Sequence, residues 1–168
     1  MNHVLLTRIS QLLLIFPCAC REWINVLNDI EQYNRILNFA LQLISFPSAS
    51  KAEIIFNRAT TAKLFPHLIA IGWIAAHAVS ALIISSGFVN LVKNITAQPK
   101  TYHQKKALCT LGLSFSIFSY VMMLGFFAMD YFLSWMQQIN FNSDLIGYTM
   151  PPLAALLFLN YTESEVSH

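Results

Sequence analysis

The residues most able to do chemistry are a few ionisable side chains that interrupt long apolar stretches. His77 lies near the middle of one such stretch, and His67 lies near its beginning. Arg21 and Glu22 fall within a second stretch, and Asp130 ends a third. Ionisable groups are costly inside a bilayer. Each of these residues is therefore a candidate for binding a ligand or a partner.

His77 has two interpretations. On a helix it shares a face with Trp73 and Ser80, where a neutral imidazole can hydrogen-bond to a serine or to Tyr120 of a neighbouring helix. The alternative is a ligand-binding or proton-relay histidine. Haem ligation by two histidines usually takes one from each of two helices, whereas His67 and His77 lie on one helix, about 15 Å apart in rise. Haem or quinone binding is therefore not indicated, and no cofactor is predicted.

Arg21 and Glu22 are adjacent, and neighbouring residues of a helix point to different faces. We therefore expect them not to pair with each other. Partners on other helices are expected instead, Glu22 with His67 or Arg21 with Asp130. The alternative is that these side chains extend to the lipid headgroups.

Other chemistries leave no signature in the sequence. There is no nucleotide-binding loop, nucleophile elbow, zinc-protease motif or pair of catalytic carboxylates. Cys18, Cys20 and Cys109 lack metal-ligand spacing, which favours structural thiols. A net charge of +2 is too small for an electrostatic nucleic-acid binder. The sequence therefore predicts no catalytic residue, no metal and no nucleic-acid partner, and it favours a protein that is not an enzyme.

Membrane-spanning helices must position these candidate residues. Of 168 residues, 56% are hydrophobic and only 11% are charged, against about 25% charged in soluble domains. A hydrocarbon core needs about 20 apolar residues of helix. The predicted fold is all-α, a single integral membrane domain built as a four-helix bundle. Its spans are expected at about residues 4–27, 64–92, 107–129 and 145–161.

The first span allows two interpretations, because Pro17, Arg21 and Glu22 interrupt it. A retained helix kinked at Pro17 is favoured. A cleaved signal peptide with its core at residues 12–16 is the alternative, and that core is short.

The long external loop at about residues 28–63 is expected to carry amphipathic helices. Apolar residues recur at helical spacing from Tyr33 to Ile44, and residues 50–53 form a capping box for a second short helix towards Thr61. We interpret them as a cap at the outer leaflet; a docking surface for a partner is the alternative.

Small residues predict where the second and third spans pack together. Gly72, Ala76 and Ser80 form a small-residue stripe on the second span, and Gly112 and Ser116 lie on the third. Such stripes let helices approach closely in a membrane.

The loop between the second and third spans carries four lysines, whereas the loop between the third and fourth carries no lysine or arginine. Lysine and arginine mark cytoplasmic loops. With four spans, both termini are therefore expected to be cytoplasmic.

Several short motifs lie at or near the ends of the spans, and one of them, Gly112-Leu113, lies within the third span. They are Arg8-Ile9-Ser10, Asn28-Asp29-Ile30 with Tyr33 and Asn34, His67, Gly112-Leu113, Asp130-Tyr131-Phe132 with Trp135, and Phe141-Asn142. On these motifs the chain resembles an uncharacterised bacterial family of predicted small four-span integral membrane proteins. The resemblance covers nearly the whole chain and implies a retained first span in the bacterial inner membrane. It implies no activity.

Two functions follow as hypotheses. The first is a non-catalytic accessory or assembly subunit of a larger inner-membrane complex, based on the small size and the faces suited to packing. Its partners would be the lipid bilayer and other membrane subunits or a second copy. The second is a lipid-, quinone- or haem-binding protein that uses a pocket near His67 and His77. A transporter is the least favoured class, because the spans are few and no repeat is visible.

Overall fold

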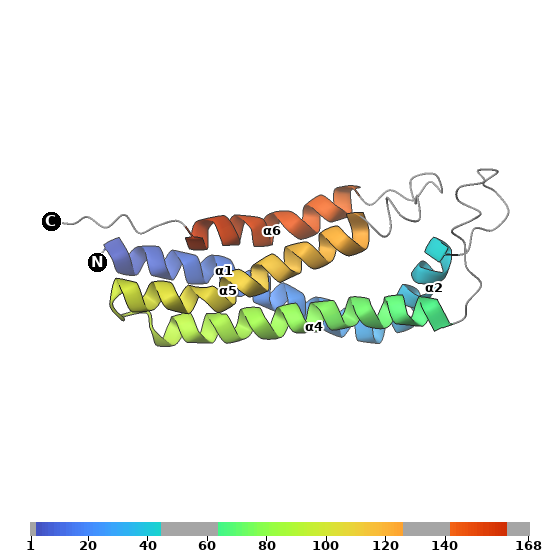
Figure 1. Cartoon of the computed structure of the whole chain (residues 1–168), viewed down its shortest axis with the longest axis horizontal. Coiled ribbons are helices and arrows are strands. Elements are labelled where there is room, and N and C mark those ends of the chain that lie inside the picture. Colours follow the sequence, from blue (N-terminus) through green and yellow to red (C-terminus); the bar gives the residue numbers. More distant parts are fainter. Residues whose placement is uncertain (1–2, 45–63, 126–141, 161–168) are drawn as a thin grey trace.

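All the elements of the described chain are helices (Figure 1). The computed structural model describes residues 3–44, 64–125 and 142–160. The helices are α1 (His3–Glu31), α2 (Tyr33–Ile44), α4 (Leu64–Lys93), α5 (Pro99–Tyr120) and α6 (Asn142–Asn160). The predicted all-α fold is confirmed, and α2 covers the predicted amphipathic stripe. The second predicted loop helix lies outside the described residues.

Four of these helices lie side by side as a bundle. α4 packs against α1 and α5, and α6 packs against α5 and α1. The start of α1, the end of α6 and the turn between α4 and α5 share one end of the bundle (Figure 1). α2 lies at the opposite end, where it contacts α4. The described chain therefore has a basic end, which carries the lysine-rich turn, and an α2 end.

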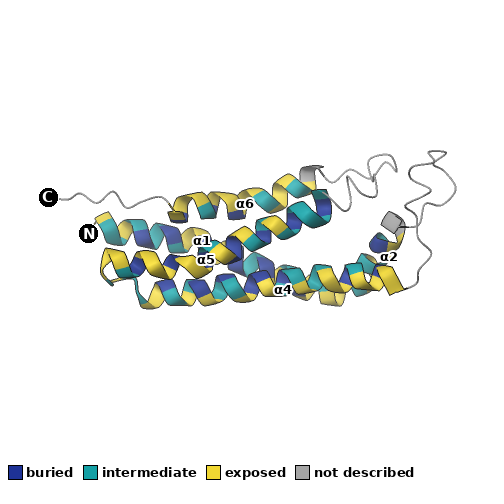
Figure 2. Ribbon diagram, viewed as in Figure 1, coloured by how far each residue is buried: buried dark blue, intermediate teal, exposed yellow. Residues whose placement is uncertain are grey.

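Within the described residues, three helical segments are long and apolar enough to cross a membrane: α1 with 29 residues, α4 with 30, and residues 99–125 with 27. α6, with 19 residues, is not among these three. Exposed residues run along the outward faces of the helices (Figure 2), and many of them are large apolar residues. In water such a surface would drive aggregation, whereas in a bilayer it faces lipid chains. Whether α6 forms a fourth span stays a prediction.

The helix ends differ from the expected spans. α1 continues to Glu31, so Asp29 lies on a spanning helix rather than in the loop. α5 begins at Pro99, at a position where the missing N–H of proline breaks no helical hydrogen bond. α1 also runs without a break through Pro17.

The closest approach of α4 and α5 depends on two glycines. A Cβ on Gly87 would lie 2.6 Å from the backbone nitrogen of Cys109, and a Cβ on Gly112 would lie 2.8 Å from that of Ile84. Side chains at either position would push the backbones apart. The two helices therefore run antiparallel with Gly87 opposite Cys109 and Ile84 opposite Gly112.

The predicted packing stripe is correct only in part. Gly112, Ser116 and Ser80 are buried, and Ala76 is half-buried. Gly72 is exposed, and a Cβ there would meet nothing within 4 Å. The close approach lies at Gly87, which faces α5 about four turns further along α4 than Gly72.

Arg8 ties α1 to the turn at the basic end. Its Nη1 donates to the carbonyl oxygens of Ile95 at 2.8 Å and Ala97 at 2.7 Å. Its guanidinium carbon lies 4.2 Å from the ring centre of Tyr102. These carbonyls belong to the turn between α4 and α5. Arg8 therefore holds this turn against α1, with only 3% of its surface exposed.

Substituting Gly87 with alanine should destabilise the bundle by about 1–3 kcal/mol, the usual cost of overpacking. The matched substitution Gly72→Ala should be neutral or stabilising by up to about 1 kcal/mol, because alanine favours helix and has room there. Denaturant unfolding in detergent micelles, followed by circular dichroism, measures both. Equal effects of the two substitutions would contradict the close approach at Gly87.

Candidate functional site

Polar side chains from α1, α4 and α5 meet inside the bundle, on the α2 side of the α4–α5 close approach. Glu22 and Asp29 are seven residues apart on α1, so two turns of helix place both carboxylates on one face. His77 faces them from α4, and Ser116 and Tyr120 face them from α5. We call this set the Glu22–His77 cluster; its members are Arg21, Glu22, Asp29, His77, Ser116 and Tyr120.

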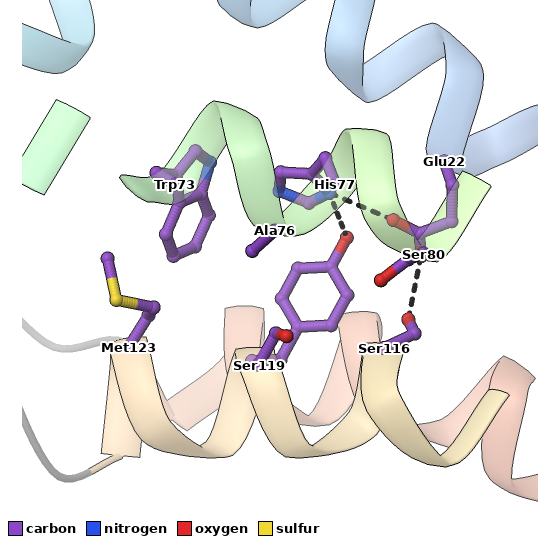
Figure 3. Close-up of a pocket in the computed structure, with 9 residues that line it drawn as sticks. Glu22, Trp73, Ala76, His77, Ser80, Ser116, Ser119 and Met123 are labelled. Atoms are coloured by element: carbon purple, nitrogen blue, oxygen red, sulfur yellow. Dashed lines mark hydrogen bonds and ion pairs between the residues drawn. The ribbon is translucent and has the colours of Figure 1, made fainter. Parts of the chain in front are cut away.

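The Glu22 carboxylate is the centre of the cluster and is 1% exposed. Its Oε2 lies 2.9 Å from His77 Nδ1. Its Oε1 accepts hydrogen bonds from Ser116 Oγ at 2.8 Å and from Arg21 Nη2 at 3.2 Å. Figure 3 shows Glu22, His77 and Ser116 turned towards one another. A buried carboxylate is tolerated only when it is paired and hydrogen-bonded, and Glu22 meets both conditions.

Arg21 pairs with its neighbour Glu22, so the expectation that the two cannot pair is wrong. Their Cβ atoms do point to different faces, but the arginine side chain is long enough to bend back. Arg21 Nη2 also donates to the carbonyl oxygen of Tyr148 at 3.0 Å. The guanidinium lies 5.6 Å from the ring centre of Tyr120 and 5.9 Å from that of Tyr148. Arg21 thus links α1 to α5 and α6.

His77 is hydrogen-bonded to Tyr120 across the α4–α5 interface, as predicted. Tyr120 Oη lies 3.2 Å from His77 Nδ1 and accepts a hydrogen bond from Asn25 Nδ2 at 2.9 Å. The Tyr120 ring stacks on Tyr148, with centres 4.9 Å apart and planes within 11°. The ring position of Tyr120 is therefore fixed from three sides, by α1, α4 and α6.

The other nitrogen of His77 faces a second carboxylate. His77 Nε2 lies 3.7 Å from Asp29 Oδ2. The side chain of His77 is 6% exposed and that of Asp29 is 17% exposed. The imidazole therefore stands between a fully buried carboxylate and one that reaches the edge of the bundle.

The expected partner of Glu22, His67, lies elsewhere. His67 is exposed in the first turns of α4, and its Nδ1 lies 2.8 Å from Tyr33 Oη of α2. The two rings are also stacked. His67 therefore attaches α2 to α4 and takes no part in the cluster. Asp130 lies outside the described residues, so its predicted pairing with Arg21 does too.

A small cavity of about 10 Å³ borders the cluster (Figure 3). Its lining includes Glu22, Ser80, Ser119 and Tyr120. Ser80 Oγ is buried and has no hydrogen-bond partner among the described residues. A cavity of this size with several polar groups fits one water molecule.

A larger groove of about 690 Å³ opens at the α2 end. Apolar side chains from α2, α4 and the helical residues 121–125 that follow α5 form its walls, including Ile36, Phe39, Phe65, Leu68 and Met123. Polar side chains from α1, the turn between α1 and α2, α2 and α6 also line it: Asn25, Asn28, Asp29, Gln32, Arg35, Asp144 and Tyr148. Its volume falls within the range of small-molecule sites, about 300–1,000 Å³. Asp29 belongs to both this groove and the Glu22–His77 cluster.

The described residues offer no group of three histidine, cysteine or acidic side chains that could hold a metal ion. Cys18, Cys20 and Cys109 are free thiols. Neither histidine nor cysteine lines the groove in this part of the chain.

A family model matches residues 7–162, under the description "Predicted small integral membrane protein (DUF2165)". The chain belongs to this family. The resemblance drawn from the end motifs is thereby confirmed, and the protein is an integral membrane protein in contact with a lipid bilayer. The chain matches no curated protein and no solved structure.

Sequence reasoning missed Asp29 and Arg8 as partners. Both stood in motifs that mark helix ends, and their burial was not foreseen. The seven-residue spacing of Glu22 and Asp29 was the available signal, because it places two carboxylates on one face of an apolar helix. The predicted first span ends at about residue 27, which leaves Asp29 in the predicted loop, so the spacing does not point to a shared helix face at that stage.

Substituting Ser116 with alanine should destabilise the protein by about 1–3 kcal/mol, because the buried Glu22 carboxylate loses a donor. The matched substitution Ser80→Ala removes a hydroxyl that has no partner in the described chain, so its effect should stay within about 0.5 kcal/mol. Thermal unfolding of both variants in the same detergent tests this. An equal loss in both would show that Ser116 does not stabilise the carboxylate.

Proposed function

We propose that this membrane protein binds a phospholipid whose headgroup carries both an ammonium and a phosphate group. The observation that carries the proposal is the groove at the α2 end, which combines apolar walls with charges of both signs. Its volume of about 690 Å³ suits a headgroup and the upper parts of the acyl chains. The groove lies at the ends of membrane-crossing helices, where headgroups are found.

The charged side chains of the groove are complementary to such a headgroup. Asp29 and Asp144 offer carboxylates to an ammonium group, and Arg35 offers a guanidinium, which binds phosphate well. Trp73 and Tyr148 add aromatic faces, which attract cations.

A haem would need an iron ligand, and no histidine or cysteine lines the groove among the described residues. A quinone needs neither carboxylate nor guanidinium. A phospholipid is therefore favoured over haem and quinone. The proposed binding site is the groove rather than a pocket near His67 and His77.

Native mass spectrometry of the protein released from mild detergent tests the lipid proposal. Wild-type protein should retain phosphatidylethanolamine in preference to phosphatidylglycerol. Asp144→Asn and Arg35→Gln should each lower the affinity by about tenfold, equivalent to about 1.4 kcal/mol. Lys100→Gln, at the basic end, is the matched control and should leave binding unchanged. Equal retention of both lipids would overturn the proposal.

The same measurement addresses the accessory-subunit hypothesis, which stays a prediction. Exposed apolar faces support it, since they suit a partner helix as well as lipid. A subunit of a larger complex should appear with stoichiometric partner masses. A monomer that carries only lipid would count against that role.

We propose that the basic end faces the cytoplasm of the bacterial inner membrane. Lys93, Lys100 and Lys105 at this end support the orientation, because lysine and arginine accumulate in cytoplasmic segments. Arg8 and Lys106 are less informative, since both are buried. The expected cytoplasmic termini lead to a simple test. A fluorescent protein fused to the C-terminus should fold and fluoresce, whereas a phosphatase fused there should be inactive; the reverse pattern would contradict the orientation.

A further inference from the structure

We infer that His77 carries a proton between Asp29, at the wall of the groove, and Glu22, inside the bundle. The imidazole is placed for this role, with Nδ1 2.9 Å from Glu22 Oε2 and Nε2 3.7 Å from Asp29 Oδ2. The groove and the buried cavity beside Glu22 share no lining acid. His77 is the side chain that joins the acid of one to the acid of the other.

The groups around His77 favour one of its protonation forms. A neutral imidazole carries one N–H and can donate to only one carboxylate. If Nδ1 donates to Glu22, an unprotonated Nε2 turns its lone pair towards Asp29 Oδ2. That oxygen is buried and accepts no hydrogen bond from any described residue. An imidazolium donates from Nδ1 to Glu22 and directs its Nε2–H and positive charge towards Asp29 Oδ2, 3.7 Å away, so it pairs with both carboxylates.

The surrounding charges favour the same form. α1 presents Arg21, Glu22 and Asp29 to His77, α5 presents Tyr120, and α6 presents Tyr148 behind Tyr120. Arg35 of α2 and Asp144 of α6 line the groove further out. With His77 protonated, two positive charges balance the carboxylates of Glu22 and Asp29. With His77 neutral, the interior carries an uncompensated negative charge, which is costly away from water.

Transfer needs one small movement and no other reactant. The resting imidazolium exchanges with two neutral forms. In one, Asp29 has rotated towards Nε2, the Nε2–H bond breaks as an Asp29 O–H bond forms, and the ring keeps its proton on Nδ1. In the other, the Nδ1–H bond breaks as Glu22 Oε2 takes that proton, and the ring keeps its proton on Nε2. Passing from the first form through the imidazolium to the second moves one proton from Asp29 to Glu22. Glu22 then holds the proton beside a cavity of the size of one water molecule. The reverse sequence returns it to the groove.

The test is nitrogen-15 NMR of histidine-labelled protein in lipid bilayers at neutral pH, with His77 assigned by its loss in H77Q. Both ring nitrogens of His77 should give protonated, imidazolium-type signals. One protonated and one unprotonated nitrogen in the wild type would overturn the inference.

Variants of Asp29 then test whether its carboxylate is the group that faces the protonated Nε2 of His77. Asp29→Asn should convert His77 to the neutral form with the proton on Nδ1, and Asp29→Glu should restore the imidazolium. Asp144→Asn, which removes a carboxylate from the same groove but not from the cluster, should leave the His77 spectrum unchanged. An imidazolium that persists in Asp29→Asn would overturn the relay. The bilayers contain phosphatidylglycerol alone, which lacks the ammonium group of the proposed ligand, so the inference stands or fails separately from lipid binding.

Discussion

A carboxylate buried between membrane-crossing helices is the constraint on which the rest of this structure depends. Glu22 is almost fully buried, and an ionised group in such a place is stable only if other groups neutralise it and donate hydrogen bonds to it. Ser116, His77 and Arg21 do so from α5, α4 and α1. Removing any one donor leaves the buried charge less well hydrogen-bonded. The relative positions of α1, α4 and α5 therefore depend on the contacts of Glu22.

The close approach of α4 and α5 allows the donors on these two helices to surround the Glu22 carboxylate. Gly87 and Gly112 bring the two backbones into contact, and the antiparallel register that follows places His77 beside Tyr120. A bundle held apart by larger side chains could not bring the hydroxyl of Ser116 to the carboxylate on α1. Backbone packing near the middle of the bundle thus sets the geometry of polar contacts three turns away.

Asp29 connects the polar interior with the groove at the α2 end. Asp29 takes part in both, and Tyr33 of α2 holds His67 at the start of α4. Arg8 holds the turn between α4 and α5 against α1 at the basic end. The apolar side chains exposed around the bundle face lipid. The Glu22–His77 cluster and the groove both lie towards the α2 end.

Composition and the spacing of apolar residues were enough to predict an all-helical integral membrane protein, because the thickness of the bilayer fixes how long an apolar helix must be. Helical periodicity also predicted the amphipathic helix from Tyr33. The small-residue faces of the second and third spans led to the prediction that His77 meets a serine or Tyr120 of the neighbouring helix, and the structure shows the contact with Tyr120. Only the tertiary structure decided which charges pair. Glu22 meets His77 rather than His67, Arg21 bends back to Glu22, and Gly87 rather than Gly72 makes the close approach. These choices depend on the register between helices, which is set by packing across the whole interface and is not encoded in the spacing along any single helix.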